Sequence, residues 1–275
     1  MQPMAIITIV LLFICGVIGP THLHGQDSPR VPLGGVHFTD VTVAAGLEGK
    51  SGGQTSSWAD TNGDEAVDVM TPAGLFLNNG SGVFTRVEGV PGGEGIWGDV
   101  DNDGLPDFLC VDGAGTLLLN RGAAGFQAAP FPGNPGASRP RAAFADANAD
   151  GFLDLYITNY EATFGGPIIA DRFYLATGAA TFADPTILSG KDCWAARGAN
   201  WADFDNDGDQ DLYVSNYRLM PNALWVNNGD GTFRDEAKAR GVYGDATAGS
   251  EPASPWYSAY EYTGHTIGSC WGDLN

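Results

Sequence analysis

The stretch from Trp201 to Val214, WADFDNDGDQDLYV, places four aspartates within nine residues. They are Asp203, Asp205, Asp207 and Asp211, at positions 1, 3, 5 and 9 of a loop with Gly208 at position 6. Carboxylates this close together repel one another unless a positive charge lies among them, and a simple turn needs only one or two Asp or Asn residues and a Gly. Oxygen ligands at this density around a Gly bend are typical of a Ca²⁺ site. The stretch therefore predicts a calcium loop rather than an acidic hairpin turn.

The same spacing occurs three more times. The residues at positions 1, 3, 5 and 9 are, in chain order, Asp60, Asn62, Asp64 and Asp68; Asp99, Asp101, Asp103 and Asp107; and Asp146, Asn148, Asp150 and Asp154. A fifth copy begins at Asp273, its predicted first ligand, and is cut off. We expect Ca²⁺ in up to four complete loops. Loops 99–107 and 203–211 should bind it most strongly, because Glu65 replaces the Gly of loop 60–68 and Asn148 removes one charge from loop 146–154.

An EF-hand begins with the same spacing, but it also needs an acidic residue at position 12 and a helix on each side. Position 12 is Thr71, Cys110, Ile157 or Val214 in the four loops. The flanking segments are rich in Tyr, Val, Ile and Phe, which favour strands. These loops are therefore not EF-hands.

The segments around each loop repeat as well. A short apolar segment ending in Trp or Phe precedes the first Asp, and a strand-like run such as DFLCV or DLYVSNY follows the last Asp. Another strand then closes on a Gly turn, as in LFLNNGSG and LWVNNGDG, which is a strong hairpin signal. A fourth short strand opens at Phe84, Phe126, Phe182 and Phe233. The first ligands are 39, 47, 57 and 70 residues apart, so a unit of about 40 residues is lengthened by insertions.

Four antiparallel strands per unit predict an all-β fold, a β-propeller of four-stranded blades. Residues 37–47, HFTDVTVAAGL, match residues 232–242, TFRDEAKARGV, in Phe, Asp, Ala and Gly. The mature chain is therefore expected to begin with an outermost strand that would complete the last blade of a closed ring. About four blades and the start of a fifth are present, and we expect a chain truncated at its C-terminus within a partial propeller over residues 30–275.

The N-terminal segment predicts a protein that is secreted, periplasmic or on the cell surface. The apolar run Ala5–Ile18 has the length of a signal-peptide core, which predicts a signal peptide over residues 1–25 and no membrane span after its removal. The net charge of −20 argues against nucleic acid or an anionic membrane as partner. Cys110, Cys193 and Cys270 remain beyond the signal peptide. Their spacing matches no zinc-binding motif, and the sequence leaves open whether two of them form a disulfide.

Two insertions interrupt the repeat, at residues 161–169 and 243–268. The second carries four aromatic residues, Trp256, Tyr257, Tyr260 and Tyr262. Aromatic side chains on a loop can stack on sugars or grip a partner, and they can equally pack over the neighbouring blade.

The pattern D-x-[DN]-x-[DN]-G-x-x-D between strands resembles the FG-GAP/VCBS repeat family over about residues 36–275. This family includes the calcium-binding blades of integrin α-subunits and bacterial proteins similar to cartilage acidic protein. The resemblance implies a seven-bladed propeller, secreted or on the surface, that acts in cell adhesion or recognition. It also implies that the side chains at positions 1, 3, 5 and 9 hold the ion together with the main-chain carbonyl at position 7. Position 7 is Ala66, Leu105, Phe152 or Asp209 in the four loops.

Two classes of function remain open at this point. The first is a non-enzymatic propeller, stabilised by calcium, whose partner is an extracellular protein or glycan. The alternative is a polysaccharide lyase or hydrolase, or a scaffold for a catalytic domain absent from this sequence. Its candidate residues, Arg141, Arg197, Tyr262 and His265, form no recognisable catalytic spacing, so we assign no catalytic residue.

Overall fold

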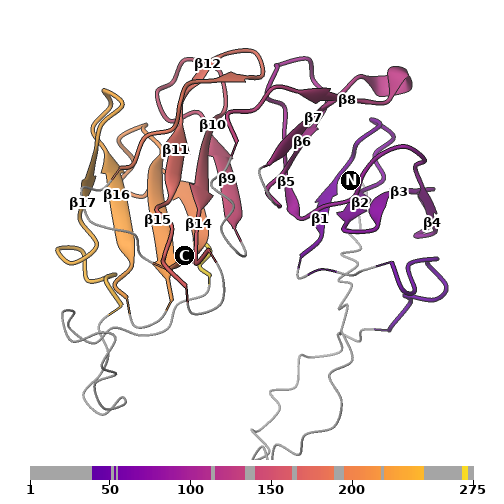
Figure 1. Ribbon diagram of the computed structural model, residues 1–275, viewed down its shortest axis with the longest axis horizontal. Helices are drawn as coiled ribbons and strands as arrows, with labels where there is room; N and C mark the ends of the chain where they lie inside the picture. Colours follow the sequence, from indigo (N-terminus) through magenta and orange to yellow (C-terminus); the bar gives the residue numbers. More distant parts are fainter. Residues whose placement is uncertain are drawn as a thin grey trace, which may run out of the picture.

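The computed structural model is built from antiparallel sheets that follow one another along the chain (Figure 1). It describes residues 39–50, 53, 55–112, 115–133, 140–162, 166–188, 195–217, 220–244 and 268–271. Three sheets have four strands in chain order, as the repeat predicts. Blade 1 contains β1 (Ser57–Ala59), β2 (Asp68–Thr71), β3 (Gly74–Asn78) and β4 (Phe84–Arg86). Blade 2 contains β5 (Gly95–Gly98), β6 (Asp107–Cys110), β7 (Thr116–Asn120) and β8 (Phe126–Ala129), with the 3₁₀ turn η1 (Gly122–Ala124) before β8. Blade 4 contains β14 (Ala196–Ala202), β15 (Asp211–Asn216), β16 (Ala223–Asn227) and β17 (Phe233–Asp235).

Blade 3 departs from the predicted pattern. Its sheet has three strands, β9 (Arg141–Ala145), β10 (Asp154–Thr158) and β11 (Arg172–Tyr174). The next two strands, β12 (Ala176–Gly178) and β13 (Thr181–Phe182), pair only with each other, and a register shift falls between Ala176 and Gly178. Ala180 has a positive φ of 51°, so this turn differs from the Asn-Gly turns of the other blades. The predicted fourth strand at Phe182 therefore forms, but as part of a separate hairpin.

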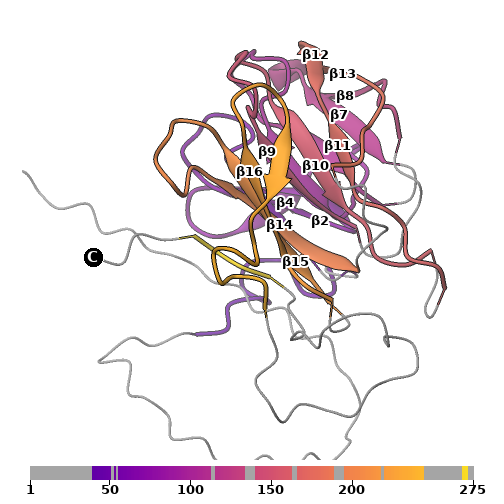
Figure 2. The same ribbon diagram turned by 90° about the vertical axis from the view of Figure 1, so that its left-hand side faces the viewer.

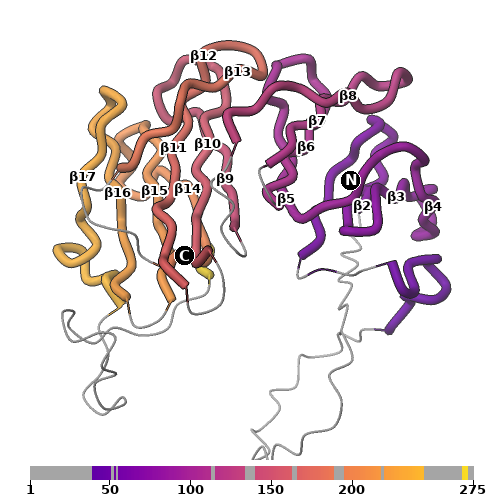
Figure 3. Tube along the Cα trace, viewed as in Figure 1, coloured from indigo at the N-terminus to yellow at the C-terminus, as the bar shows by residue number. Residues whose placement is uncertain are grey.

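The blades stand side by side, and the first strand of each blade is the innermost. The strands β1, β5, β9 and β14 contact one another in this order. Figure 3 follows the chain through the four blades in sequence order, and Figure 2, seen from the side of blade 4, shows the sheets lying one behind another. Sheets arranged face to face around their first strands form a propeller-like fold, which confirms the predicted fold class.

The core lies between neighbouring blades, because each sheet has apolar residues on both faces. Blades 1 and 2 share a cluster that includes Met70, Leu75 and Phe108. Blades 2 and 3 share a cluster that includes Leu109, Leu155 and Tyr174. Blades 3 and 4 meet through residues such as Tyr156, Phe173, Leu212 and Trp225. Each blade thus depends on its neighbours to bury its faces.

The predicted match between residues 37–47 and 232–242 holds over the part of the first segment that the structure describes. Ala45 donates its N–H to the Val41 carbonyl, just as Arg240 donates to Glu236. Leu47 donates to Thr42, just as Val242 donates to Ala237. The first segment forms turns and not a strand from residue 40 onward, and Ala45 and Leu47 pack on blade 1.

The beginning of a fifth unit is also visible. Asn200 on the inner strand of blade 4 donates its side-chain N–H to the carbonyl and the hydroxyl of Ser269. Trp271 stacks on Phe204 at a centroid distance of 6.2 Å. Residues 268–271 therefore lie beside β14, where the inner strand of a next blade is expected.

Several predictions fall outside the described residues. They are the signal peptide at 1–25, the ligand Asp273, the aromatic residues 256–262, Cys193 and His265. Within the described ranges no helix is long and apolar enough to cross a membrane, and no α-helix flanks any of the four loops. The exclusion of an EF-hand is therefore confirmed.

Candidate metal sites in the four acidic loops

Each acidic loop connects the first strand of a blade to the second. The residue before position 1 pairs with position 9 in every blade: Ala59 with Asp68, Gly98 with Asp107, Ala145 with Asp154 and Ala202 with Asp211. The last Asp is therefore the first residue of the second strand. The hairpin register brings the two ends of the loop together and makes its acidic residues converge.

The aspartate at position 1 organises the turn by accepting backbone N–H groups. In loop 99–107, Asp99 accepts the N–H of Asp103 at 3.0 Å and that of Gly104 at 2.9 Å. The equivalent pairs of bonds occur at Asp60, Asp146 and Asp203. Because these bonds point the loop backbone inward, the side chains of the loop face a common centre.

Position 6 is left-handed in all four loops, as its Gly predicts. Gly104, Gly151 and Gly208 have φ values of 88°, 87° and 95°, and Glu65 adopts 68° despite its side chain. Position 4 is left-handed too, a feature that the sequence analysis missed. Its residues and φ values are Gly63 at 76°, Asn102 at 59°, Ala149 at 56° and Asn206 at 60°.

Replacing Glu65 by Gly is expected to stabilise the protein by about 1 kcal/mol, since a left-handed backbone costs a residue with a Cβ roughly that much. Urea unfolding in the presence of a chelator measures the change. Gly151→Ala is the matched control in the third loop: a Cβ there has no atom within 4 Å, so backbone strain alone acts. The control should lose a similar amount. A neutral effect of both changes would contradict this explanation.

The aspartate at position 9 fastens the loop to the sheet. Asp107 is fully buried; its Oδ2 accepts the N–H of Val100 at 3.0 Å, and its Oδ1 accepts the N–H of Asn120 on β7 at 2.7 Å. Asp68, Asp154 and Asp211 are equally buried and make the same two kinds of bond. Burial raises the pKa of Asp107 to about 6, and the charges of Asp101 and Asp103 act in the same direction. A cation beside it would oppose that rise, because it favours the ionised form.

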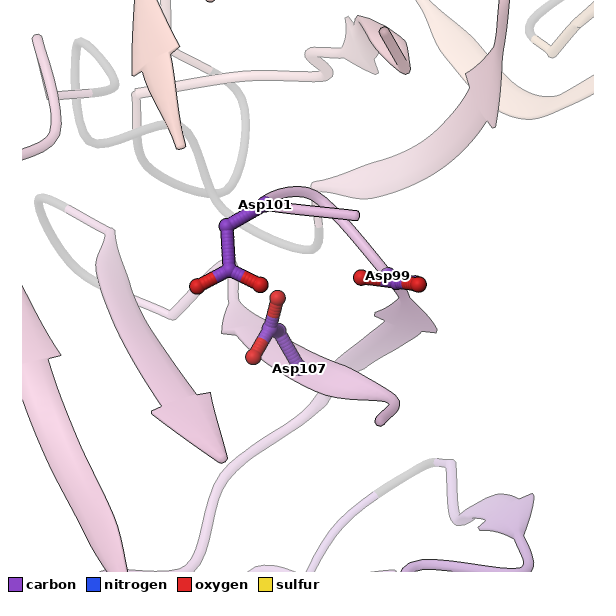
Figure 4. Close-up of side chains that lie close together, drawn as sticks. All are labelled: Asp99, Asp101 and Asp107. Atoms are coloured by element: carbon purple, nitrogen blue, oxygen red, sulfur yellow. The ribbon is translucent and has the colours of Figure 1, made fainter. Parts of the chain in front are cut away.

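In two loops, the carboxylates at positions 1, 3 and 9 converge on one point. Oxygens of Asp99, Asp101 and Asp107 lie within 4.8 Å of one another, and Figure 4 shows the carboxylates of Asp101 and Asp107 facing each other. Loop 203–211 brings Asp203, Asp205 and Asp211 together in the same way. Asp101 Oδ1 is buried and has no hydrogen-bond partner within the described ranges. Three anionic oxygens at this separation, one of them without a donor, fit a hard divalent cation.

The predicted ligands at position 5 do not belong to these groups of three. Asp103 and Asp207 instead accept the N–H of position 7, at 2.9 and 3.0 Å. In the two loops with Asn at position 3, the Asn side chain also bonds within the loop. Asn62 donates to Asp64 and Asn148 donates to Asp150, both at 3.0 Å. Because these two loops have Asn at position 3, they cannot bring three carboxylates together at positions 1, 3 and 9 as loops 99–107 and 203–211 do.

Two arginines that the sequence analysis did not single out lie against these acids. Arg121 Nη1 is 2.5 Å from Asp101 Oδ2 and 3.0 Å from Asp103 Oδ2. Arg240 Nη2 is 4.0 Å from Asp205 Oδ2. Each guanidinium partly neutralises the loop, so a metal ion at loop 99–107 must compete with Arg121 for Asp101. Arg121 directly follows β7, and this position was the only sequence signal that could have placed it near loop 99–107.

Replacing Arg121 by Met is expected to strengthen Ca²⁺ binding at loop 99–107 about tenfold, because it removes a cation that competes for the same carboxylates. Calorimetry with Ca²⁺ measures the affinity. The control is Arg86→Met, which removes a guanidinium paired with Glu88 away from the loops and should leave the affinity unchanged. Weaker binding after Arg121→Met would mean that Arg121 supports the site.

A hydrogen bond ties each of the first three loops to the following blade. The acceptor is always the carbonyl at position 2: Thr61 accepts from Asn120 Nδ2 at 2.8 Å, and Ala147 accepts from Asn227 Nδ2 at 2.7 Å. Blade 3 has Ala176 where the other blades have this Asn. There the backbone N–H of Ala180 bonds to the Val100 carbonyl at 2.7 Å. Since the N–H of position 2 bonds to the buried Asp at position 9, loop order and blade contact are coupled through the two backbone groups of one residue.

The two arginines considered as catalytic candidates lie at the other end of the inner strands. Arg141 opens β9, five residues before its loop, and pairs with Glu94 at 3.4 Å. The Arg197 guanidinium lies over the rings of Tyr160 and Tyr217, at 4.1 and 5.2 Å. Among the described residues, neither pairs with an acid of the loops.

Comparison with solved structures finds chains of low similarity. An Agrocybe aegerita lectin, whose title describes recognition of non-reducing terminal N-acetylglucosamine, is 19% identical with a TM-score of 0.47, and the match covers 64% of this chain and 49% of the lectin. The Tc holotoxin pore of Photorhabdus luminescens is 18% identical with a TM-score of 0.38, over 66% of this chain and 9% of that one. The biofilm matrix protein Bap1 of V. cholerae is 17% identical with a TM-score of 0.38, over 65% of this chain and 27% of Bap1. This chain thus spans less than half the length of each.

No curated protein matches the chain. Residues 99–157 and 203–275, however, match the FG-GAP-like repeat. These two segments contain the second, third and fourth acidic loops and the beginning of the fifth copy. On this match and on the repeated blades, the chain contains FG-GAP-like repeats, as the predicted resemblance to the FG-GAP/VCBS repeat family implies.

Proposed function

We propose that this protein is a secreted or surface β-propeller that binds Ca²⁺ in its acidic loops and acts in adhesion or recognition. The observation that carries the calcium assignment is the convergence of three carboxylates in loops 99–107 and 203–211, where no described residue donates to Asp101 Oδ1. An all-oxygen set on a flexible loop suits Ca²⁺ better than Zn²⁺, which prefers His and Cys, or Mg²⁺, which demands strict octahedral geometry.

The proposed Ca²⁺ ligands are the side chains at positions 1, 3, 5 and 9 of each loop. Bound Ca²⁺ supplies positive charge, and its main role is to hold the loops. Fourteen of the 33 acidic residues are loop ligands, so four bound ions would bring the net charge of −20 to about −12. Less self-repulsion among the loops stabilises the packed blades.

Removal of calcium is expected to lower the melting temperature. An ion present at a hundred times its Kd stabilises the folded state by about 2.7 kcal/mol per site. Calorimetry should give strong binding at two sites, and the double variant Asp101→Asn/Asp205→Asn should lose both. If Ca²⁺ binds nowhere and a chelator leaves the melting temperature unchanged, the calcium proposal fails.

The recognition role is supported by the family and by the architecture, a rigid scaffold that displays loops around an axis. A glycan array probed with the calcium-loaded chain tests it directly, with immobilised extracellular matrix proteins as a second arm. We expect binding that weakens after chelation, because the scaffold loosens. If the calcium-loaded chain binds nothing in either arm, the recognition role fails, while the calcium proposal is unaffected.

A further inference from the structure

A cavity of about 220 Å³ lies at the end of the inner strands away from the acidic loops. Three blades contribute to it through the residues at the starts of β1, β5 and β9, which are neighbours in Figure 1. Its polar lining consists of Thr55, Ser56, Ser57, Glu94 and Arg141. Its apolar lining includes Ile96, Val111 and Pro140. We propose that this cavity binds one neutral, hydroxyl-rich ring, namely a sugar unit of a glycan.

The charges of the described lining residues favour a neutral ligand. Glu94 Oε2 and Arg141 Nη1 are 3.4 Å apart, and their side chains are 13% and 28% exposed. These two opposite charges are paired, so the described lining favours neither an anion nor a cation. An anion would also approach a chain with a net charge of −20. A neutral polar ligand meets neither obstacle.

The hydrogen-bonding groups match a sugar in kind. A sugar hydroxyl donates one hydrogen bond and accepts others, so it needs both donors and acceptors around it. Arg141 supplies donors, Glu94 supplies acceptors, and the Thr55 and Ser56 hydroxyls can serve as either. Within the described ranges no hydrogen bond of these two hydroxyls is found. Ile96 and Pro140 provide apolar surface for the C–H groups of a ring.

The walls of the cavity are held in place by the sheets. The backbone of Glu94 bonds to Val111 and to the Asp112 side chain, both at 2.9 Å. The Arg141 N–H donates to the Thr158 hydroxyl at 3.1 Å, and the Ser57 hydroxyl donates to the Gly95 carbonyl. A site that is already ordered avoids the entropic cost of ordering on binding. Its size is below the roughly 300–1,000 Å³ of drug-sized pockets, which limits the ligand to a single ring.

This inference rests on the proposed recognition function, and one set of titrations tests it. The calcium-loaded chain is titrated with methyl hexopyranosides and with the matching methyl uronates, followed by saturation-transfer NMR and calorimetry. We expect a hexopyranoside to bind and the uronates to bind at least tenfold more weakly. The variant Thr55→Val/Ser56→Ala should bind the hexopyranoside at least tenfold more weakly. The control Thr85→Val, on the exposed strand β4, should bind it as the wild type does.

Glu94→Gln should increase the binding of the uronate, and a misfolded variant would not show such an increase. The substitution leaves Arg141 as the dominant charge of the cavity, so the preference should turn from the hexopyranoside to the uronate. Binding that is unaffected by all the cavity variants overturns this site but leaves the recognition function standing. If no hexopyranoside binds, the sugar assignment fails, while Ca²⁺ calorimetry and the protein arm report separately on the proposed function. Tighter binding of uronate to the wild type would contradict the charge argument.

Discussion

Asp211→Ala is expected to lower the free energy of unfolding by about 2–4 kcal/mol even in the presence of a chelator. Asp211 is fully buried and accepts the N–H groups of Phe204 and Asn227, at 3.3 and 2.9 Å. A buried donor left without an acceptor costs about 1–3 kcal/mol. The loss should therefore appear without any metal, because it comes from the hydrogen bonds that join the loop to β16.

The matched control is Asp205→Ala in the same loop. Asp205 belongs to the same group of three carboxylates, but its charge pairs only distantly with Arg240, at 4.0 Å. Its removal should change stability in chelator by about 0.5 kcal/mol or less, as expected for a surface position. Both variants should abolish Ca²⁺ binding at loop 203–211. Urea unfolding in chelator and calorimetry with Ca²⁺ give the two readouts, and hydrogen exchange at residues 204 and 227 localises the loss.

Equal losses of stability from the two variants in chelator would contradict the separation of roles. The position-9 residue would then act mainly through charge and not as a fastening between loop and sheet. In calcium, where both variants also lose the bound ion, the loss of stability from Asp211→Ala should again exceed that from Asp205→Ala. The comparison also bears on the other loops, since Asp68, Asp107 and Asp154 make the same pair of bonds.

The four-fold repeat made the blades and the loops predictable from the sequence. Alternating acids around a Gly fixed both the place of each turn and its left-handed position 6, which even Glu65 adopts. The hairpin turns after Asn78, Asn120 and Asn227 were equally predictable, and each Asn side chain accepts the N–H of the Gly two residues later. These features depend on residues close together in the chain, where local stereochemistry decides.

Features that depend on contact between blades were not predictable. The bond from Asn120 to Thr61 joins residues 59 apart, and the sequence shows Asn120 only as a turn residue. The separate hairpin of blade 3 arises where Ala176 replaces that Asn, a change that looks minor in the sequence. The cavity beside Glu94 and Arg141 forms only when three blades are placed together. Position 9 was predicted as a ligand, but its role as a fastening needs the geometry of the neighbouring strand.

Asn227→Ala is expected to weaken blade 3 and blade 4 together. The Asn227 side chain is almost fully buried and donates to the carbonyls of Ala147, at 2.7 Å, and Gln210, at 3.2 Å. Removing a buried donor from two carbonyls should cost about 1–3 kcal/mol. Because the N–H of the same residue, Ala147, bonds to Asp154, loop 146–154 should also bind Ca²⁺ more weakly, although none of its ligands has changed.

The control is the equivalent residue of blade 1, Asn78. Asn78 donates to the Val67 carbonyl of its own loop at 3.2 Å, and its described bonds all lie within blade 1. Asn78→Ala should therefore cost less and leave Ca²⁺ binding at loop 146–154 unchanged. Hydrogen exchange at residues 147–151, with and without Ca²⁺, reads out the coupling. If Asn227→Ala loosened only loop 203–211, the tie between blades would be a packing contact that transmits nothing to the metal site. Loss of protection in loop 146–154 would mean that the acidic loops and the blade interfaces order as one cooperative unit.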